Sequence, residues 1–317
     1  MHPQSKHVKY SVVIPVFNSS EIVGETIDRA AAFFERSGWS YEIIAVNDGS
    51  QDTSWKVIVE KALQNPNVLG IDLSRNYGQN TAVYCGFQKS SGDYVINMDD
   101  DLQNNPEEMV QLIAKAELNA DVVFAKYYMK KHSLVRRMGS QIIATLDRYL
   151  FGRPKDLTVT NFRIVRRDVI NKICDIRTPY PYIRGLLLMT AHDPANVIVQ
   201  HENRVAGSSQ YTPFKITAFI VRILLSYAVF NFRTLIGVGS LLSIPSMLLG
   251  MYLFSEGLFT PTTMNVPGWA WFFIFLLLLI NAAILALGVH GWYALRRLSK
   301  KKSGSFYNIK ETIGPRG

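Results

Sequence analysis

Short apolar runs alternate with amphipathic stretches along the first 125 residues of the chain. Runs with the character of buried strands, many of them rich in β-branched residues, cover residues 10–16, 41–46, 68–73, 92–98 and 120–125. Stretches with apolar positions at helical spacing lie between them, over residues 21–36, 54–63, 79–90 and 106–118. This alternation over short connections predicts an α/β domain with a doubly wound, mostly parallel sheet.

Polar residues gather where the first four predicted strands end. These strand ends carry Pro15-Val16-Phe17-Asn18, Asn47-Asp48-Gly49, Arg75-Asn76 and Asp99-Asp100-Asp101. In doubly wound sheets, ligands bind beyond the carboxyl ends of the strands. Turn chemistry could explain any one of these groups, but four at the same predicted edge indicate a binding site there.

The three consecutive aspartates, Asp99 to Asp101, are the most informative of these groups. Three carboxylates at the end of a buried strand are costly unless a cation or strong hydrogen-bond donors lie beside them. Oxygen ligands suit Mg²⁺ or Mn²⁺, which usually complete their coordination with water and substrate phosphates. The sequence therefore predicts a metal and diphosphate site. The alternative is an acidic loop in which an aspartate caps the next helix.

Two longer apolar segments, residues 235–254 and 269–290, lie in the last third of the chain. Each is long enough to cross a bilayer, and neither has the polar face that a surface helix requires, which disfavours two buried helices of a soluble domain. The connector, residues 255–268, holds a single charge, whereas basic residues flank both segments. The polar residues 1–10 contain no signal-peptide run. This pattern predicts a multi-pass protein of the inner (plasma) membrane with a cytoplasmic N-terminal domain.

The charge of the chain is unbalanced, with 34 Lys and Arg against 25 Asp and Glu, for a net charge of +9. Such an excess suits nucleic acid, an anionic membrane or phosphorylated substrates. Much of it lies in or beside two amphipathic stretches, residues 134–151 and 213–232, which favours a membrane surface over nucleic acid. The two cysteines lack metal-ligand spacing, and no dinucleotide-binding or P-loop motif occurs.

Four motifs resemble those of the family 2 glycosyltransferases: SVVIPVFN (11–18), VNDGSQDTS (46–54), LSRNYGQ (73–79) and MDDDLQNNPE (98–107). They are most similar to the polyprenyl-phosphate glycosyltransferases, the group of dolichol-phosphate mannose synthase and the bacterial O-antigen glucosylation enzymes. The resemblance implies a GT-A fold. It also implies an inverting transfer from a nucleotide sugar, a UDP- or GDP-sugar, to a polyprenyl phosphate lipid such as undecaprenyl phosphate.

The resemblance also assigns roles to individual residues. The implied nucleotide-binding residues are Pro15, Phe17, Asn18, Asp48, Asn76, Asp99 and Asp100. The implied ligands of Mg²⁺ or Mn²⁺ are Asp99, Asp101 and Gln103. The role of Asp100 stays open, because the family often has Ala at this position.

Two further segments bear on the acceptor. Residues 160–164 resemble a family segment that commonly reads Gly-Asp-Phe-Arg-Leu, with Asn161 in place of Asp. Asn cannot act as a general base, whereas a lipid phosphate is already anionic and needs none; Asn161 could instead bind the donor sugar. Residues 201–211 resemble a loop in which Arg204 and Ser209 match. With Arg136 and Arg137, they are the candidates for holding the acceptor phosphate.

The expected organisation is a catalytic domain over residues 1–212, a juxtamembrane helix over 213–233, two transmembrane helices within 234–293 and a basic cytoplasmic tail over 294–317. Assembly into a homo-oligomer through the spans is a further expectation. Two alternatives stay open. One is a transferase that elongates a lipid-linked glycan, for which Asp156 would be a nearby candidate base. The other is a non-catalytic membrane scaffold, which the intact aspartates disfavour.

Overall fold

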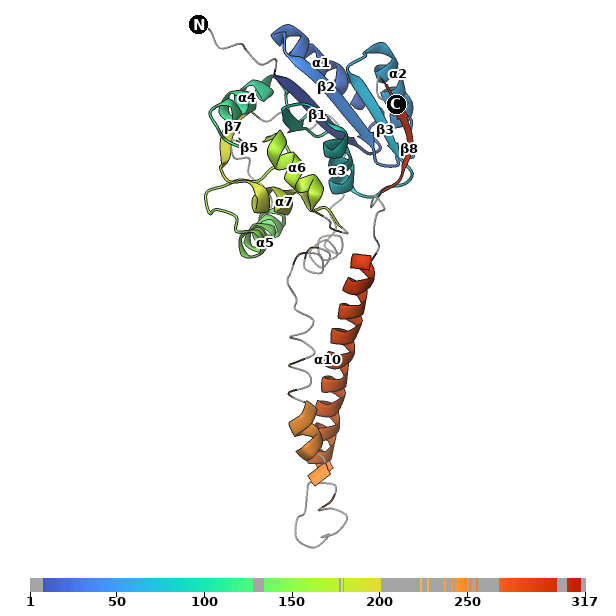
Figure 1. Ribbon diagram of the computed structural model, residues 1–317, viewed down its shortest axis with the longest axis vertical. Helices are drawn as coiled ribbons and strands as arrows, with labels where there is room; N and C mark the ends of the chain where they lie inside the picture. Colours follow the sequence, from blue (N-terminus) through green and yellow to red (C-terminus); the bar gives the residue numbers. More distant parts are fainter. Residues whose placement is uncertain are drawn as a thin grey trace. The chain divides into compact units, whose positions relative to one another are not determined.

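The computed structural model describes residues 8–127, 134–176, 178, 180–200, 223, 227, 237, 241, 243–249, 251–252, 255, 268–300 and 307–314 (Figure 1). The chain forms two compact units. The first comprises Met1–Ser226 together with Ser305–Gly317, and the second comprises Tyr227–Gly304. The chain therefore leaves the first unit once and returns to it.

An eight-stranded mixed sheet forms the centre of the first unit, with strand order β7-β5-β6-β4-β1-β2-β3-β8. The strands are β1 Lys9–Val16, β2 Ser40–Asn47, β3 Val68–Leu73, β4 Tyr94–Asn97, β5 Val122–Tyr127, β6 Arg163–Arg166, β7 Pro194–Val199 and β8 Ile309–Ile313. The pairings among β1 to β4 are parallel, as is β5 with β7, whereas β6 and β8 run antiparallel to their neighbours. The sequence predicted the first five strands but none of the last three.

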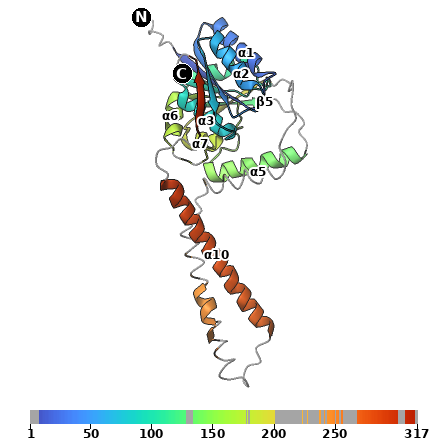
Figure 2. The ribbon, with the colours of Figure 1, turned by 90° about the vertical axis from the view of Figure 1, so that its right-hand side faces the viewer.

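The helices of the first unit are α1 Val23–Ser37, α2 Ser54–Gln64, α3 Gln79–Lys89, α4 Met109–Glu117, α5 Leu134–Phe151, α6 Arg167–Asp175 and α7 Ile183–Thr190. One turn of 3₁₀ helix, Pro106–Glu108, precedes α4. The first five were predicted from their spacing, and α5 has the predicted ends. Helices cover both faces of the sheet (Figure 2), so its central strands are buried on both sides, as their continuous apolar runs require.

The two faces of β1 pack against different helices. Val12 and Ile14 lie in the core that includes apolar residues of α1 and α4. Val13 points to the other face, where α3 approaches closely: a Cβ atom added at Gly86 would lie 2.3 Å from Val13 Cγ1. Only glycine fits this contact, which sets the distance between α3 and the sheet.

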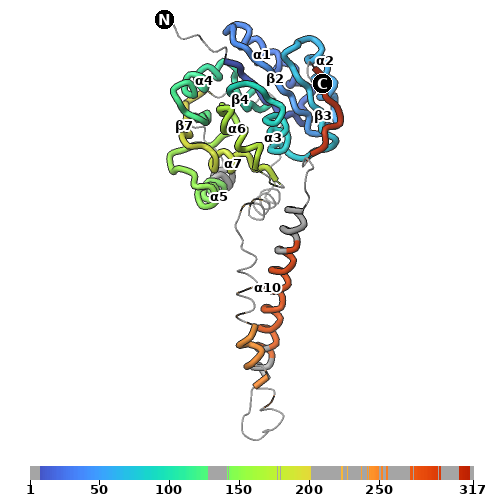
Figure 3. Tube along the Cα trace, viewed as in Figure 1, coloured from blue at the N-terminus to red at the C-terminus, as the bar shows by residue number. Residues whose placement is uncertain are grey.

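The C-terminal strand β8 corrects one prediction. The sequence analysis assigned residues 294–317 to a tail, whereas residues 309–313 form the edge strand beside β3 (Figure 3). Gly70 of β3 pairs with Ile313, and Asp72 pairs with Glu311. The segment 309–313 has five residues, two of them charged, and its apolar pattern is too short to predict a strand. It forms a strand because it pairs with the free edge of β3.

The second unit contains the helix α10, Gly268–Lys300. Many apolar side chains of α10 are exposed, for example Phe273, Leu279 and Leu287. Asn281 is buried, and its Nδ2 donates a hydrogen bond to Ser246 Oγ at 3.3 Å.

The interpretation of residues 235–254 and 269–290 as membrane spans stays a prediction. α10 is the helix expected over the second of these segments. Within the parts of the chain that the structure describes, no helix combines the length and hydropathy required to cross a bilayer. The expected juxtamembrane helix over residues 213–233 lies almost wholly outside the described residues.

Replacing Gly86 with Ala tests the packing of α3 against β1. We expect the G86A variant to lose about 1–3 kcal/mol of unfolding free energy, because the added methyl group overlaps Val13 and must displace the helix or the strand. Urea unfolding followed by fluorescence measures the change. Lys89→Ala, at an exposed position of the same helix, is the matched control. Equal stability of the two variants would contradict the close contact.

Candidate active site

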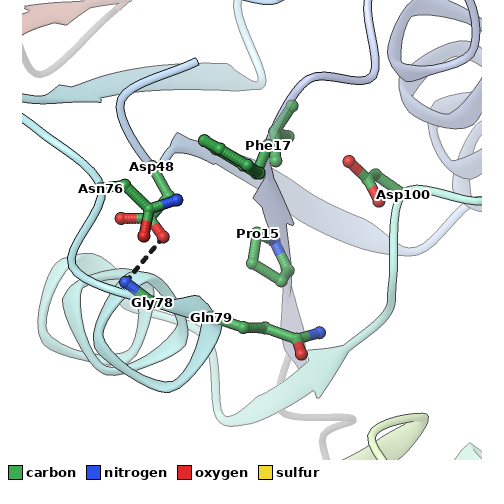
Figure 4. A pocket seen from close by; sticks show the side chains of 8 residues that line it. Pro15, Phe17, Asp48, Asn76, Gly78, Gln79 and Asp100 are labelled. Atoms are coloured by element: carbon green, nitrogen blue, oxygen red, sulfur yellow. Dashed lines mark hydrogen bonds between the residues drawn. The ribbon is translucent and has the colours of Figure 1, made fainter. Parts of the chain in front are cut away.

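A pocket lies at the carboxyl ends of the central strands, where the sequence predicted a binding site. Its lining residues are Pro15, Val16, Phe17, Asp48, Asn76, Gly78, Gln79 and Asp100. Figure 4 shows Asp48 and Asn76 on one side of the pocket and Asp100 on the other, with Pro15 and Phe17 between them. Segments that are distant in sequence meet here because parallel strands bring their carboxyl ends to one edge of the sheet.

Asp48 directly follows β2 and is buried, with 2% of its surface exposed. Its Oδ1 accepts a hydrogen bond from the Tyr77 N–H at 2.7 Å, and its Oδ2 accepts one from the Gly78 N–H at 2.8 Å. Burial raises the pKa of Asp48 to about 6, although these two donors oppose the shift. Asp48 therefore holds the loop after β3 in place while it faces the pocket.

Close backbone contact also joins the loops after β2 and β3. Gly49 has a φ of +65°, and a Cβ atom there would lie 2.4 Å from the carbonyl carbon of Arg75. Asn18 joins the loop after β1 to the same region: its N–H donates to Ser50 Oγ, and its Oδ1 accepts from the Gln51 N–H, both at 2.9 Å. Asn18 is not among the residues that line the pocket, and nucleotide binding by Asn18 stays a prediction.

The three aspartates follow β4. Asp99 Oδ1 accepts a hydrogen bond from Gln79 Nε2 at 2.6 Å, and Asn161 Nδ2 lies 3.4 Å from both Asp99 oxygens. Burial, and then the neighbouring carboxylates of Asp101 and Asp100, raise the pKa of Asp99 to about 7. The fold thus brings Asn161 to the aspartates across 62 residues of sequence.

Asp100 lines the pocket, and its carboxyl group has a raised pKa. Burial raises its pKa to about 6, the Ser19 side chain opposes the shift, and Asp101 adds to it. Its Oδ2 is buried without a hydrogen-bond partner. Leu102, the next residue but one, has a φ of +55°, a strained conformation for a residue with a side chain. An unpartnered carboxylate oxygen and a strained turn beside like charges mark this segment as a functional site.

The predicted metal ligands fit a site completed by substrate. Among the described residues, no three His, Cys, Asp or Glu side chains form a metal-binding group. Mg²⁺ and Mn²⁺ are usually held by one or two carboxylates plus phosphate and water, so Asp99 and Asp101 fit such an ion when the diphosphate is present. The backbone N–H of Gln103, the third predicted ligand, donates a hydrogen bond to Asp101 Oδ1 at 3.2 Å.

Arg163 on β6 lies beneath the site and was not predicted as a separate site residue. It is fully buried, and its Nη2 donates to Asn97 Oδ1 at 2.8 Å. Burial, together with the positive charge of Arg184, lowers the pKa of Arg163 to about 9, whereas Asp99 opposes the shift. The sequence feature that could have identified Arg163 is a charged residue within an otherwise apolar run.

The amphipathic helix α5 is joined to this part of the molecule through a buried carboxylate. Asp147 Oδ1 accepts a hydrogen bond from the Tyr182 hydroxyl at 2.8 Å, and Arg184 Nη2 lies 3.1 Å from Asp147 Oδ2. Arg136 and Arg137 lie in the first turn of α5, but their side chains are not described. Arg204 and Ser209 also lie outside the described residues.

The raised pKa values of the aspartates predict a dependence of stability on pH. A carboxyl group whose pKa is higher in the folded state binds more protons when folded, so the contribution of Asp99 and Asp100 to stability falls as the pH rises from about 4 to about 7. Asp100→Asn removes one of these charges. We expect this variant to be about 1–3 kcal/mol more stable than the native protein near pH 8, with the difference disappearing near pH 4.

Chemical unfolding at both pH values measures this difference. Asp156→Asn serves as the control, because Asp156 is exposed and does not line the pocket. If Asp100→Asn is no more stable than this control at high pH, burial and the neighbouring Asp101 do not destabilise the Asp100 carboxylate.

Comparison with known proteins reveals the relatives of this chain. Residues 11–174 match the family model of Glycosyl transferase family 2. The chain is 31% identical to the undecaprenyl-phosphate 4-deoxy-4-formamido-L-arabinose transferase of Proteus mirabilis (strain HI4320), over 96% of this chain and 94% of the relative. The enzyme with the same name from Photorhabdus laumondii is 30% identical, with the same coverage of both chains.

A similar fold occurs in a solved structure, glucosyl-3-phosphoglycerate synthase from Mycobacterium tuberculosis in complex with Mn²⁺ and uridine-diphosphate-glucose. The TM-score is 0.50, with 16% identity, over 69% of this chain and 77% of that one. At this identity the likeness concerns the fold alone, and it supports a GT-A-like arrangement around the mixed sheet.

Proposed function

This chain belongs to glycosyl transferase family 2, and we propose that it transfers a sugar from a nucleotide sugar to undecaprenyl phosphate or a similar polyprenyl phosphate. The observation that carries the proposal is the pocket between Asp48 and the aspartates, which lies within the residues that match the family. Relatives named undecaprenyl-phosphate transferases align over nearly the full length of both chains, which supports the choice of acceptor.

The donor nucleotide occupies the pocket in this proposal. Phe17 is 41% exposed, which is unusual for a large aromatic residue and leaves a face for a base to stack on. Asp48 can accept hydrogen bonds from base N–H groups, because each carboxylate oxygen has a lone pair beyond the one used by the loop. The choice between UDP- and GDP-sugars depends on contacts that these residues do not specify.

A divalent cation, Mg²⁺ or Mn²⁺, belongs beside the aspartates. Asp99 and Asp101 would hold it, and it would offset the negative charge that develops on the leaving nucleoside diphosphate. The like charges of the aspartates and the unpartnered Asp100 Oδ2 support this site. The related glucosyl-3-phosphoglycerate synthase structure contains Mn²⁺ with its nucleotide sugar.

The acceptor phosphate attacks the sugar with inversion and without a general base. Asn161 lies beside Asp99 at the place where a base would be expected, and its amide cannot remove a proton. A phosphate monoester has a second pKa near 6 and is mostly ionised at neutral pH. Asp156, the candidate base of a glycan-elongating enzyme, is exposed and does not line the pocket. Arg136, Arg137, Arg204 and Ser209 remain our candidates for binding the acceptor phosphate.

We place the enzyme at the inner membrane, with the catalytic unit on the cytoplasmic face. A lipid acceptor requires access to a membrane, and exposed apolar side chains along α10 suit contact with lipid. The pairing of β3 with β8 adds a constraint: the two strands must share one compartment, so the chain between them crosses the membrane an even number of times. Two crossings, over residues 235–254 and 269–290, satisfy it. Assembly of several copies through these segments is part of the same proposal.

Direct assay tests the activity. The purified protein is incubated with undecaprenyl phosphate, Mg²⁺ or Mn²⁺ and a panel of UDP- and GDP-sugars, and glycolipid is detected by mass spectrometry. We expect one donor to give a glycosylated lipid phosphate. Asp101→Ala should lower the rate about a hundredfold or more, because the charge of the leaving diphosphate is no longer offset.

Asp156→Asn is the control for this variant and should keep full activity. Binding of Mn²⁺ in the presence of UDP or GDP gives a second readout, which Asp101→Ala should weaken. Full activity of Asp101→Ala, or full activity of the native protein in excess chelator, would contradict the metal site. Absence of product with every donor would contradict the proposed reaction.

Reporter fusions test the topology. A reporter inserted near Thr262 should lie outside the cytoplasm, whereas one joined after Gly317 should lie inside, because β8 belongs to the cytoplasmic unit. Labelling of whole and opened cells distinguishes the two positions. A cytoplasmic reporter at both positions would mean that the chain does not cross the membrane.

A further inference from the structure

The segment just before β8 is hydrogen-bonded to the loop that lines the donor pocket. The Ser74 N–H donates to the Asn308 carbonyl at 2.9 Å, and the Asn308 N–H donates to the Tyr77 hydroxyl at 3.3 Å. The same hydroxyl lies 2.9 Å from Ser74 Oγ. Residues on both sides of Asn76, a pocket residue, are therefore held by a segment that comes more than 200 positions later.

A second set of contacts leads from β8 to the end of β2. Lys310 Nζ lies 3.0 Å from Asp72 Oδ2, and Asp72 Oδ1 accepts a hydrogen bond from Asn47 Nδ2 at 2.7 Å. Asp72 and Asn47 are buried, and Asn47 directly precedes Asp48. This route connects the C-terminal strand to Asn47, the neighbour of Asp48, which lines the pocket on the same side as Asn76.

The two routes meet at Asp48. Its carboxylate accepts hydrogen bonds from the Tyr77 and Gly78 N–H groups, and the backbone at Gly49 touches that at Arg75. The loop itself has little packing to fix it, because Ser74, Arg75 and Asn76 are exposed. Hydrogen bonds to Asn308, just before β8, and to Asp48 therefore determine its conformation.

We infer that residues 308–310 are a positioning element of the donor site: they hold the loop 74–78 in the conformation that binds the nucleotide. The inference rests on the proposed function, because it takes the pocket to be the donor site. A loop that is ordered before binding avoids the entropy cost of ordering it on binding, so loss of these contacts should weaken nucleotide affinity. The donor site is then complete only when the chain has returned from the second unit to the sheet.

A different role for β8 must be distinguished from this one. An added strand also covers the free edge of β3 and stabilises the sheet without any effect on the pocket. The contact between Trp55 Nε1 and Glu311 Oε2, 3.2 Å long, represents that role, because it joins β8 to α2 and not to the loop. Removing it should affect stability alone.

The test compares Tyr77→Phe with Trp55→Phe in the full-length protein. Tyr77→Phe removes the hydroxyl and keeps the aromatic ring, which lies 4.9 Å from the Arg75 guanidinium carbon. Titration calorimetry with UDP and GDP measures the dissociation constant, and hydrogen exchange followed by mass spectrometry measures the opening of the loop. Lys310→Ala tests the second route in the same way.

We expect Tyr77→Phe to raise the dissociation constant about three- to tenfold, the loss expected from one or two neutral hydrogen bonds. Amide exchange over residues 74–80 should become faster, and the turnover number at saturating donor should stay unchanged. Trp55→Phe should leave affinity and loop exchange within twofold of the native values, whatever its thermal stability.

The outcomes separate this inference from the proposed function. If the native protein binds nucleotide and Tyr77→Phe binds it equally well, the positioning role is wrong and the donor site stands. If Trp55→Phe weakens affinity as much as Tyr77→Phe, β8 acts through general stability and the inference is overturned. If the native protein binds neither UDP nor GDP, the donor site itself is wrong, and this inference falls with it.

Discussion

The carboxylate of Asp48 is the interaction on which the rest of the site depends. It is buried, and it accepts hydrogen bonds from two successive N–H groups of a loop that follows a different strand. A buried carboxylate without such donors would be strongly destabilising, so the loop must adopt the conformation that supplies them. The pocket wall at Asn76 and Gly78 is a consequence of this requirement.

Asp100, on the opposite side of the pocket, differs from Asp48 in its hydrogen bonding. There, Asp99, Asp100 and Asp101 lie together. Burial, and then the charges of Asp101 and Asp100, raise the pKa of Asp99, and Asp100 Oδ2 has no hydrogen-bond partner. Among the residues that the structure describes, Gln79 and Asn161 donate side-chain hydrogen bonds to Asp99. Both oxygens of Asp48 thus have hydrogen-bond donors within the protein, whereas Asp100 Oδ2 has none.

The C-terminal strand joins these local features to the organisation of the whole chain. Because β8 pairs with β3, the sheet that carries the pocket includes residues from both ends of the sequence. The second unit, Tyr227–Gly304, is inserted between them. An enzyme that must meet a water-soluble donor and a lipid acceptor would gain from this order, since both ends of the inserted unit are joined to the catalytic one.

The sequence alone determined the elements whose pattern is local: β1 to β5, the helices between them and α5, because burial on one or both faces imposes a repeating apolar pattern. It also determined which strand ends carry polar groups. Tertiary structure decided what local pattern cannot contain: the antiparallel strands β6 and β8, the buried Arg163, and the use of Asn18 to hold a neighbouring loop. These features depend on which free strand edge or buried partner is available after the chain has folded. The residues of a short segment such as 309–313 do not by themselves specify the strand with which it pairs.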